Sequence, residues 1–420
     1  MLNTEHTAGT LVSAVSVLAI NGGSSSIKFT LYRMGDLRQR RLHGKVDRIG
    51  LHDTTLTFYN QERNQRDSRI VGNFDHQSAA NFLIGWLDEQ IDLTSIQAVG
   101  HRIVNGGAHY NKPQRVTQEL LDALRRISAY APEHLPSEIA VIDLLRERVP
   151  DLPQIVCFDT AFHREMPRVA KILPIPRRFQ AQGVERYGFH GLSYAFLLDE
   201  LARVAGAKVA RGRVVLAHLG NGASLAAVRG GKGIDTSMGF TPAAGVPMGT
   251  RSGDLDPGLV WYLAQTEQMN AEQFHHMTNH ESGLLGVSET SSDLRDLLAR
   301  EDGDVRAAEA VALFCYQVKK YIGGFAAALG GLGTLVFAGG IGENAPTVRA
   351  RICAGLEFLG IEIDEERNIT NASVISTATS RVAVRVMHTD EEVMIAESVC
   401  RVLNLPTEKE KEHGRRNENI

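Results

Sequence analysis

Residues 15–32 read V-S-V-L-A-I-N-G-G-S-S-S-I-K-F-T-L-Y, and the architecture of the chain follows from this stretch. Its apolar run stops at Asn21-Gly22-Gly23 and then resumes with apolar and polar residues in alternation, which predicts two strands paired as a hairpin. The two glycines let the backbone turn without a Cβ in the way, and the serines at 24–26 offer hydroxyl groups to an anion. Taken alone, the stretch is consistent with either a phosphate-binding turn or an ordinary hairpin loop.

A second copy of this pattern lies far along the chain. Residues 213–228 read R-V-V-L-A-H-L-G-N-G-A-S-L-A-A-V, again a strand, a Gly-Asn-Gly turn and a resumed strand. Two such turns predict a duplicated α/β domain pair with a nucleotide in the cleft between the copies. This organisation resembles the actin, sugar-kinase and heat-shock ATPase superfamily, whose fold is α/β with duplicated actin-like (ribonuclease H-like) domains and a cleft between two lobes.

The composition agrees with two domains. The 420 residues are 43% hydrophobic and 22% charged, which is typical of a globular protein with large cores. The formal net charge of −4 gives no electrostatic footprint for nucleic acid or anionic lipid, so we expect neither as a partner. We expect an N-terminal lobe over 1–160, a C-terminal nucleotide-binding lobe over 161–390, a helix over about 391–403 packing back on the N-terminal lobe, and a disordered tail over 404–420.

The cysteines and the N-terminus bear on the compartment. The four cysteines lie far apart without metal-site spacing, so we expect reduced thiols in a cytoplasmic protein and neither a disulfide framework nor a zinc site. The apolar run Leu11–Ile20 is too short for a membrane span and lacks the basic start of a signal peptide. We therefore expect no membrane association.

Polar residues at two predicted strand ends are candidates for anion and metal binding. Arg102 follows a short strand and precedes a double glycine, and its planar fork matches a carboxylate or a phosphate, although a surface salt bridge would fit the same spacing. Asp159 follows the buried strand 154–158, at the sheet edge where ligands of α/β proteins gather. It can serve Mg²⁺ or a substrate network, or simply cap the next turn.

Two further candidates lie in glycine-rich segments. His190 is displayed in R-Y-G-F-H-G, where a histidine is less often purely structural. Arg251 lies in residues 235–257, a long segment whose Phe240 and Met248 argue against a disordered linker and for a functional loop. We expect a helix to follow, with Asp256 as its N-cap.

Three later segments allow a functional and a structural interpretation. The glycine-rich turn at 339–344 between a strand and a helix suits a nucleotide, or simply close strand–helix packing. The acids at 390–392 can bind Mg²⁺ or stabilise a helix N-terminus. The polar residues 291–295 can be ordinary helix capping.

In this order, the motifs resemble the acetokinase family over nearly the whole chain, from about Val15 to Leu403. The resemblance implies reversible transfer of the ATP γ-phosphoryl to acetate, giving acetyl phosphate and ADP, with Mg²⁺ or Mn²⁺, in a homodimer. The matching segments are N-G-G-S-S-S-I-K at 21–28, G-H-R-I-V-N-G-G at 100–107, F-D-T-A-F-H at 158–163, R-Y-G-F-H-G at 186–191, H-L-G-N-G at 218–222, D-T-S-M-G-F-T-P at 235–242, M-G-T-R-S-G-D-L-D-P at 248–257, S-S-D-L-R-D at 291–296 and G-G-I-G-E-N at 339–344.

The resemblance also implies roles for the matched residues around the phosphates. Asn21 and Glu391 would hold the metal, and Ser24, Ser26 and Lys28 would lie near the phosphates. The expected nucleotide-binding set comprises these three residues and His218, Leu219, Gly220, Asn221, Gly222, Asp293, Leu294, Arg295, Gly339, Gly340, Ile341, Gly342, Glu343 and Asn344.

At the reacting groups, the resemblance implies that Arg102 and Arg251 grip the carboxylate and the transferring phosphoryl. Asp159 would orient an arginine or a metal-bound water, and His190 would bond the phosphoryl in the transition state. His134 and His218 would support the site. The chemistry agrees, because a loose in-line phosphoryl transfer needs positive, preorganised hydrogen bonding, and a carboxylate is already ionised at neutral pH.

The expected acyl pocket is where the chain departs from the family. Val104, Phe189 and Pro242 match its small apolar pocket, but Glu133 stands where the family usually has leucine. A buried, unpaired carboxylate there would be costly, so Glu133 must be solvated, paired or turned away. A propionate kinase, a kinase for a larger or more polar acid and a non-catalytic ATP-dependent binding module therefore stay open. The other departures are Asn105, Leu135 and Tyr194, where the family usually has histidine, asparagine and histidine.

Overall fold

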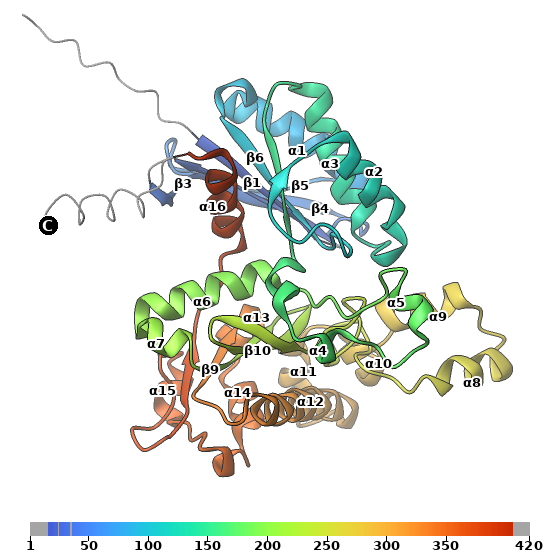
Figure 1. Ribbon diagram of the computed structural model, residues 1–420, viewed down its shortest axis with the longest axis vertical. Coiled ribbons are helices and arrows are strands. Elements are labelled where there is room, and N and C mark those ends of the chain that lie inside the picture. The colour runs from blue at the N-terminus through green and yellow to red at the C-terminus, as the bar shows by residue number, and fades with distance from the viewer. Residues whose placement is uncertain (1–15, 24, 34–35, 406–420) are drawn as a thin grey trace, which may run out of the picture.

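The computed structural model describes residues 16–23, 25–33 and 36–405 of the chain. The chain forms two lobes, each built on a mixed β-sheet, which lie one above the other in Figure 1. Ser24 lies outside the described residues, as does the expected tail beyond residue 405.

The upper lobe contains a sheet of eight strands in the order β5-β4-β3-β2-β1-β6-β8-β7. β1 and β2 pair antiparallel from Ser16↔Arg33 to Gly22↔Ile27, so the predicted hairpin is confirmed. The strands are β1 Ser16–Gly22, β2 Ser26–Arg33, β3 Asp36–Asp47, β4 Thr54–Asn60, β5 Gln65–Gly72, β6 Ala98–Ile103, β7 Gln114–Arg115 and β8 Gln154–Phe158.

The lower lobe contains a sheet of five strands in the order β11-β10-β9-β12-β13. The second predicted hairpin is confirmed too, because β9 and β10 pair antiparallel from Arg213↔Arg229 to Leu219↔Ala223. The strands are β9 Arg213–Leu219, β10 Ala223–Arg229, β11 Lys232–Thr236, β12 Thr334–Ala338 and β13 Ala383–Val386.

The two sheets repeat one topology. In the first, β3, β2 and β1 are antiparallel neighbours, and β6 and β8 then continue parallel to β1. In the second, β11, β10 and β9 are antiparallel, and β12 and β13 continue parallel to β9. The prediction of a duplicated α/β fold is therefore confirmed at the level of strand order.

Sixteen α-helices flank these sheets in the described residues. None of them is both long and apolar enough to cross a membrane. They are α1 His76–Ile91, α2 Gln118–Arg126, α3 Leu135–Arg148, α4 Arg168–Lys171, α5 Arg177–Gln180, α6 Gly191–Ala205, α7 Ala207–Ala210, α8 Gly258–Thr266, α9 Ala271–His280, α10 Gly283–Ser288, α11 Leu294–Arg300, α12 Val305–Leu329, α13 Gly339–Asn344, α14 Pro346–Cys353, α15 Glu365–Ile369 and α16 Glu391–Leu403.

The core of the upper lobe explains why α16 returns to it. Alternate residues of β1 face opposite sides of the sheet: Leu18 packs with α1 and α3, whereas Val17 packs with α16. Gly100 on β6 makes the close approach of α16 possible, because a Cβ there would lie 2.4 Å from Ile395 Cγ2 and 2.7 Å from Val399 Cγ2. Figure 1 shows α16 against the upper sheet, with α6 below it at the top of the lower lobe.

Two local expectations are wrong. The helix after the long loop begins at Gly258, and its N-cap is Pro257 and not Asp256. Asp256 precedes the N-cap, and its side chain accepts a hydrogen bond from the Gly258 N–H at 2.7 Å. Residues 339–344 form the short helix α13 and not a turn. Gly339 opens that helix at φ 76°, where a Cβ would lie 2.7 Å from Leu219 O, so the packing against β9 requires glycine there.

Candidate active site

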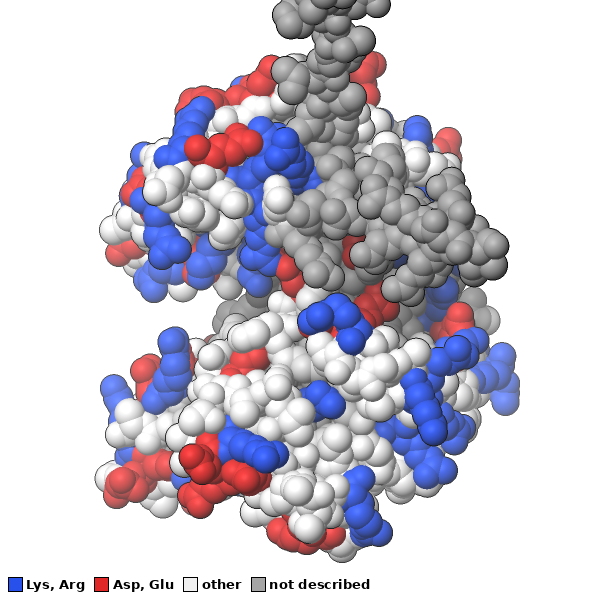
Figure 2. All heavy atoms as spheres, turned by 90° about the vertical axis from the view of Figure 1, so that its left-hand side faces the viewer, with Lys and Arg blue, Asp and Glu red and all other residues white. Residues whose placement is uncertain are grey.

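Residues of both lobes meet where α6 and α16 begin. Figure 2 shows the molecular surface hollowed between the two lobes. His218 at the end of β9 bonds Ser193 Oγ of α6 at 2.8 Å, and Ser193 Oγ bonds Thr389 Oγ1 just before α16 at 2.7 Å. Two segments far apart in sequence are thereby joined at the edge of the lower sheet.

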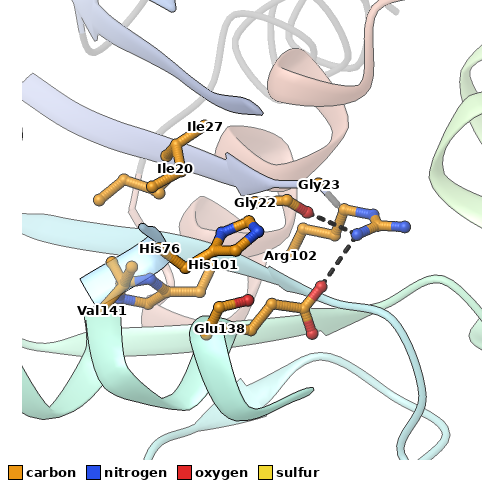
Figure 3. Close-up of a pocket in the computed structure, with 10 residues that line it drawn as sticks. Ile20, Gly22, Gly23, Ile27, His76, His101, Arg102, Glu138 and Val141 are labelled. Carbon is orange, nitrogen blue, oxygen red and sulfur yellow. Dashed lines mark hydrogen bonds and ion pairs between the residues drawn. The ribbon is translucent and has the colours of Figure 1, made fainter. Parts of the chain in front are cut away.

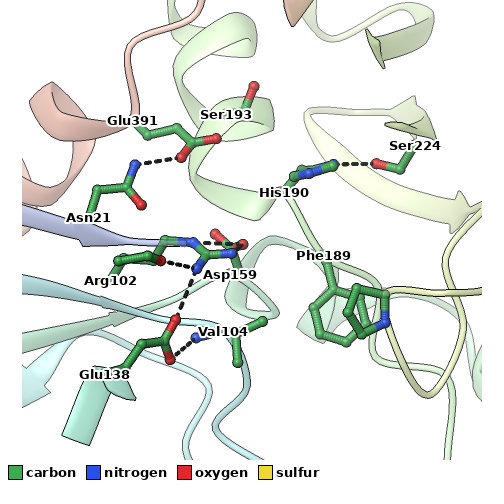
Figure 4. A network of polar contacts seen from close by, with 12 residues as sticks. Asn21, Arg102, Val104, Glu138, Asp159, Phe189, His190, Ser193, Ser224 and Glu391 are labelled. Atoms are coloured by element: carbon green, nitrogen blue, oxygen red, sulfur yellow. Dashed lines mark hydrogen bonds and ion pairs between the residues drawn. The ribbon is translucent and has the colours of Figure 1, made fainter. Parts of the chain in front are cut away.

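Arg102, near the end of β6, is held by two carboxylates. Its Nε and Nη2 donate to Asp159 Oδ2 at 3.1 and 2.6 Å, and its Nη1 donates to Glu138 Oε1 at 2.9 Å and to Gly22 O at 2.6 Å. All three charged side chains are largely buried. Figure 4 shows the two carboxylates in contact with the guanidinium. The arginine predicted at a strand end thus contacts the turn of the first hairpin through Gly22, and it is paired with Asp159.

His190 is presented by strained backbone. Its φ of 56° is in the left-handed region, which a non-glycine residue adopts at a cost, and it is the N-cap of α6. Its Nδ1 bonds Ser224 Oγ on β10 at 2.8 Å (Figure 4). Burial, followed by the neighbouring His218, Arg102 and Arg251, lowers the pKa of His190 well below its usual range. The ring is therefore neutral at neutral pH.

Arg251 lies across from Arg102 on the long loop of the lower lobe. Its Nη1 donates to Pro242 O at 3.1 Å and would lie 3.6 Å from a Cβ at Gly222, as His190 Nε2 would at 3.5 Å. No carboxylate of the described residues forms an ion pair with it. Burial and the charge of Arg102 lower the pKa of Arg251 to about 10. Two cationic groups close enough to affect each other favour an anion between them.

His134 lies near both arginines. It is the N-cap of α3, and its Nδ1 is buried without a hydrogen-bond partner among the described residues. Burial, then the charges of Arg102 and Arg251, lower the pKa of this imidazole well below the usual value. The orphaned nitrogen is suited to a hydrogen bond with a ligand or a water.

The expected metal-binding residues lie next to each other. Asn21 Nδ2 donates to Glu391 Oε2 at 2.8 Å and to Glu392 Oε1 at 2.9 Å. Burial raises the pKa of Glu392, whereas for Glu391 burial is outweighed by His218, Arg102 and Lys28, which lower the pKa. The buried Asp159 Oδ1 makes no hydrogen bond of normal geometry to any described residue.

This oxygen-rich set fits a hard divalent cation. Mg²⁺ typically takes one or two carboxylates together with substrate phosphates and waters, so a larger protein cage is not needed. Accordingly, no group of three or more His, Cys, Asp or Glu with metal-site geometry occurs in the described part of the chain. Asn21 Oδ1, Glu391 and the free oxygen of Asp159 are the groups that could serve the ion or its waters.

The second hairpin turn and α13 lie together on the lower side. Gly220 donates its N–H to Gly222 O at 3.1 Å, and a Cβ at Gly220 would lie 3.9 Å from Gly340 N. A Cβ at Gly249 would lie 2.3 Å from Asn221 Oδ1, so the Arg251 loop approaches this turn closely. The predicted glycine segments at 218–222 and 339–344 are therefore brought together.

The 293–295 segment reaches the same region less directly. Asp293 caps α11 by accepting the Arg295 N–H at 2.9 Å and pairs with the exposed Arg295 side chain. The neighbouring Ser292 O would lie 3.2 Å from a Cβ at Gly249. Leu294 is buried in the hydrophobic core. Capping, the simpler interpretation of the sequence, therefore accounts for the contacts seen here.

The acyl-pocket candidates and their departures have distinct surroundings. Val104 and Phe189 are buried together in one hydrophobic cluster, and Pro242 O binds Arg251. Glu133 is paired and partly exposed: its carboxylate lies 3.4 Å from both His275 Nε2 and His280 Nε2 of α9. The carboxylate is therefore turned toward α9, in one of the arrangements expected for it.

The three other departures are buried. Asn105 Oδ1 accepts the Gly107 N–H at 2.8 Å, and Leu135 is fully buried at the start of α3. Tyr194 OH forms a short hydrogen bond with Ser224 Oγ, the group that also bonds His190. Tyr194 thus supports His190 through one serine.

Several residues of the site were not predicted from the sequence: Glu138, Ser193, Ser224 and Thr389. Glu138 lies in the first turn of a helix, where an acid ordinarily indicates a favourable charge at the N-terminus. Glu392, one of the acids at 390–392 for which the sequence allowed metal binding or helix stabilisation, accepts a hydrogen bond from Asn21. The hydroxyl residues have no distinguishing pattern in the sequence.

Comparison with known proteins decides the family. The profile of the acetokinase family matches residues 16–397. The chain belongs to this family. An acetate kinase of Rhodopseudomonas palustris is 43% identical over 392 residues, which cover 92% of this chain and 98% of that one. A propionate kinase of Citrobacter rodentium is 42% identical over 393 residues, which cover 92% of this chain and 96% of that one.

Solved structures of the acetokinase family have the same fold. A crystal structure of Porphyromonas gingivalis acetate kinase matches with a TM-score of 0.82 at 36% identity, covering 93% of this chain and all of that one. A propionate kinase from Francisella tularensis matches with a TM-score of 0.84 at 33% identity, covering 91% and 98% of the two chains. The expected two-domain actin-like ATPase fold is thereby confirmed.

Acetokinases are ATP-dependent phosphotransferases that generally need a divalent metal ion, and this assignment holds for the chain as a family member. Relatives named acetate kinase and propionate kinase are nearly equally similar to it. Family membership therefore establishes the phosphotransferase class, while the acyl group is a separate question that the pocket residues must answer.

Proposed function

We propose that the protein is an acetate kinase. A carboxylate oxygen of acetate attacks the γ-phosphorus of ATP in line, the bond from that phosphorus to the bridging oxygen breaks, and acetyl phosphate and ADP leave. One observation carries the proposal: Arg251, a largely buried guanidinium that forms no ion pair with a carboxylate of the described residues, lies beside His190 and within electrostatic reach of Arg102 and Glu133. Such a cationic group suits the phosphoryl group while it is transferred from ADP to the carboxylate.

The protein groups have complementary tasks in this proposal. Arg251 and the remaining N–H of Arg102 bind the acetate carboxylate and the transferring phosphoryl group, which brings two anions together without repulsion. His190, neutral and fixed by Ser224, directs its Nε2 toward the phosphoryl oxygens. No general base is needed, because acetate is already ionised.

We propose that Asn21 and Glu391 hold Mg²⁺, with Mn²⁺ as an alternative, and that Asp159 orients Arg102. When bound, the cation neutralises charge on the ATP phosphates. The nucleotide would lie on the paired glycine segments 218–222 and 339–344, with Ser26 and Lys28 of the first hairpin facing its phosphates. Ser24 keeps its expected role near the phosphates as a prediction, since it lies outside the described residues.

The acyl group is the finer part of the proposal. Val104, Phe189 and Pro242 would enclose the acetate methyl group, and the pairing of Glu133 with His275 and His280 supports a carboxylate directed away from that methyl group. Propionate is the alternative substrate, because a propionate kinase is as similar as the acetate kinases are.

The deciding experiment is Mg²⁺-ATP turnover in hydroxylamine, which traps an acyl phosphate as its hydroxamate. We expect the highest kcat/KM with acetate among formate, acetate, propionate, butyrate and a hydroxy acid. A maximum with another acid would assign that acid instead. Turnover lost in Arg251→Ala would support the kinase. Nucleotide-dependent behaviour that persists unchanged in Arg251→Ala, without any hydroxamate, would favour a binding module.

We further propose a cytoplasmic homodimer. The apolar helix α8 buries none of its residues, and Val260, Trp261 and Tyr262 are 47%, 71% and 59% exposed. Large apolar side chains exposed around one short helix support a contact with a second copy of the chain. Light scattering should give twice the monomer mass for the wild type, and a lower mass for Trp261→Glu. The four cysteines are buried and form no disulfide in the described part of the chain, which is compatible with a reducing compartment.

We propose domain boundaries that follow the two sheets: an N-terminal lobe over 1–160, a C-terminal lobe over 161–390, and α16 returning to the first. The hollow between the lobes supports closure of the lobes on substrate (Figure 2). Small-angle scattering should show a smaller radius of gyration with nucleotide and acetate than without. Equal dimensions in both states would contradict closure.

A further inference from the structure

Glu138, in the first turn of α3, is a buried carboxylate with two anchored oxygens. Its side chain is 2% exposed. Oε1 accepts from Arg102 Nη1 at 2.9 Å, and Oε2 accepts the backbone N–H of Val104 at 2.9 Å (Figure 4). One side chain therefore contacts both the arginine of the anion site and the backbone of the predicted acyl-pocket wall.

Arg102 is fixed from opposite sides. Its Nε and Nη2 donate hydrogen bonds to Asp159, whereas its Nη1 donates to both Glu138 and Gly22 O. These contacts occupy four of its five N–H groups and define the plane of the guanidinium, which leaves one N–H on Nη2 for a ligand. Figure 3 shows Glu138 and Gly22 converging on this arginine beside a cavity of about 10 Å³. Without Glu138, Nη1 would keep only a backbone partner.

The carboxylate is retained at a cost to folding. Burial raises the pKa of Glu138 to about 7, although Arg102 and the Val104 N–H both favour its ionised form. An acid needed only for the helix N-terminus would avoid this cost at an exposed position, as Glu119 does in the first turn of α2. A buried charge that opposes stability beside a candidate site is typical of a functional group.

We propose that Glu138 is a positioning residue: with Asp159, it holds the Arg102 guanidinium in the orientation that binds the carboxylate substrate, and it ties that guanidinium to the backbone at Val104. This inference rests on the proposed carboxylate kinase activity. The substrate contacts Arg102, and Glu138 acts through it. The role therefore concerns binding of the carboxylate more than binding of ATP.

The test compares Glu138→Gln and Glu138→Asp with the matched control Glu119→Gln, another acid in the first turn of a helix of the same lobe. Glutamine has the size of glutamate but only one acceptor oxygen, so it cannot serve Arg102 and Val104 together. We expect Glu138→Gln to raise KM for the carboxylate by about tenfold, with KM for ATP changed by less than about twofold. Glu138→Asp should retain more of the carboxylate affinity, and Glu119→Gln should match the wild type.

A double-mutant cycle with Arg102→Lys tests whether Glu138 acts through Arg102. The effect of Glu138→Gln on KM should shrink to less than about twofold in the Arg102→Lys background. Equal effects in both backgrounds, an unchanged carboxylate KM, or loss of the folded state in both Glu138 variants would each overturn the positioning role. Wild-type turnover is measured first, since its absence would refute the proposed function. In that case, thermal unfolding would still test the positioning of Arg102. Acetate should raise the melting temperature of the wild type but not that of Glu138→Gln.

Discussion

The imidazole rings of His190 and His218 stack, with centroids 4.3 Å apart and an angle of 24° between their planes. Two protonated imidazoles would repel each other at this distance, and burial is the largest cause that lowers the pKa of each ring. Both rings are therefore neutral at neutral pH. Each ring also forms a hydrogen bond of 2.8 Å through its Nδ1, His190 with Ser224 Oγ and His218 with Ser193 Oγ. The stack presents His190 Nε2 in a fixed direction without adding a charge.

From this geometry we expect His190→Ala to lower kcat by about 10²- to 10³-fold, the range typical for loss of one preorganised donor to a developing charge. KM for ATP should change by less than about threefold, because the proposed nucleotide-binding segments lie elsewhere. Steady-state kinetics checks both values. His52→Ala, at an exposed position of the upper lobe, is the control and should retain wild-type kcat. A kcat of His190→Ala within about threefold of the wild type would remove His190 from the mechanism.

Glu138 makes stability depend on pH. Its pKa is raised from 4.5 to about 7, so between these values the folded state keeps a proton that the unfolded state has released. This contribution is fully present below about pH 4.5 and is lost as the pH rises through about 7; it amounts to at most about 3 kcal/mol. Glu138→Gln lacks it.

Consequently, the melting temperature of Glu138→Gln relative to the wild type should rise between about pH 5 and about pH 8. Scanning calorimetry at both pH values measures this difference, in which the titration of all other groups cancels. A difference that is independent of pH would mean that Glu138 titrates near its ordinary value in the folded protein.

Glu133 offers a test of acyl selectivity. Because its partly exposed carboxylate contacts the two exposed histidines His275 and His280 at 3.4 Å, Glu133→Leu should change the melting temperature little, by an amount that corresponds to about 0–1 kcal/mol. The new apolar side chain would be free to turn into the acyl pocket and fill it. We therefore expect kcat/KM for propionate to fall relative to that for acetate, by about three- to tenfold.

The matched control is His275→Gln with His280→Gln, which removes the partners of Glu133 without adding apolar volume to the pocket. Its acetate-to-propionate ratio should remain closer to the wild type than that of Glu133→Leu. If both variants shift the ratio equally, the pairing with α9 and not side-chain volume governs selectivity.

The sequence predicted those parts of the site that strand order alone determines. Arg102 lies near the end of β6 and Asp159 directly follows the adjacent parallel strand β8, so their meeting at one sheet edge could be anticipated. Glu138 could not, because its contact with Arg102 depends on how α3 packs against β6. The helix at 339–344 was not predicted because glycine disfavours helices. The close approach of Gly339 to Leu219 O, for which glycine is needed, depends on packing against β9 that the sequence does not reveal.

Gly100 provides a test of the return of α16 to the upper sheet. A Cβ at this position would lie 2.4 Å from Ile395 Cγ2, far inside contact distance, so Gly100→Ala must displace α16 or distort β6. We expect a loss of about 1–3 kcal/mol in the free energy of unfolding of the upper lobe. Because Glu391 begins α16, activity should fall as well, with a higher requirement for Mg²⁺.

Gly85 in α1 supplies the matched control, since a Cβ there meets no atom within 4 Å. Gly85→Ala should stabilise the protein by about 0.5–1 kcal/mol through helix propensity alone and leave the Mg²⁺ dependence unchanged. Calorimetry and Mg²⁺ titration of turnover measure both pairs of effects. If Gly100→Ala lowers stability without altering the Mg²⁺ requirement, the metal is held independently of the position of α16, and the proposed role of Glu391 would have to be given up.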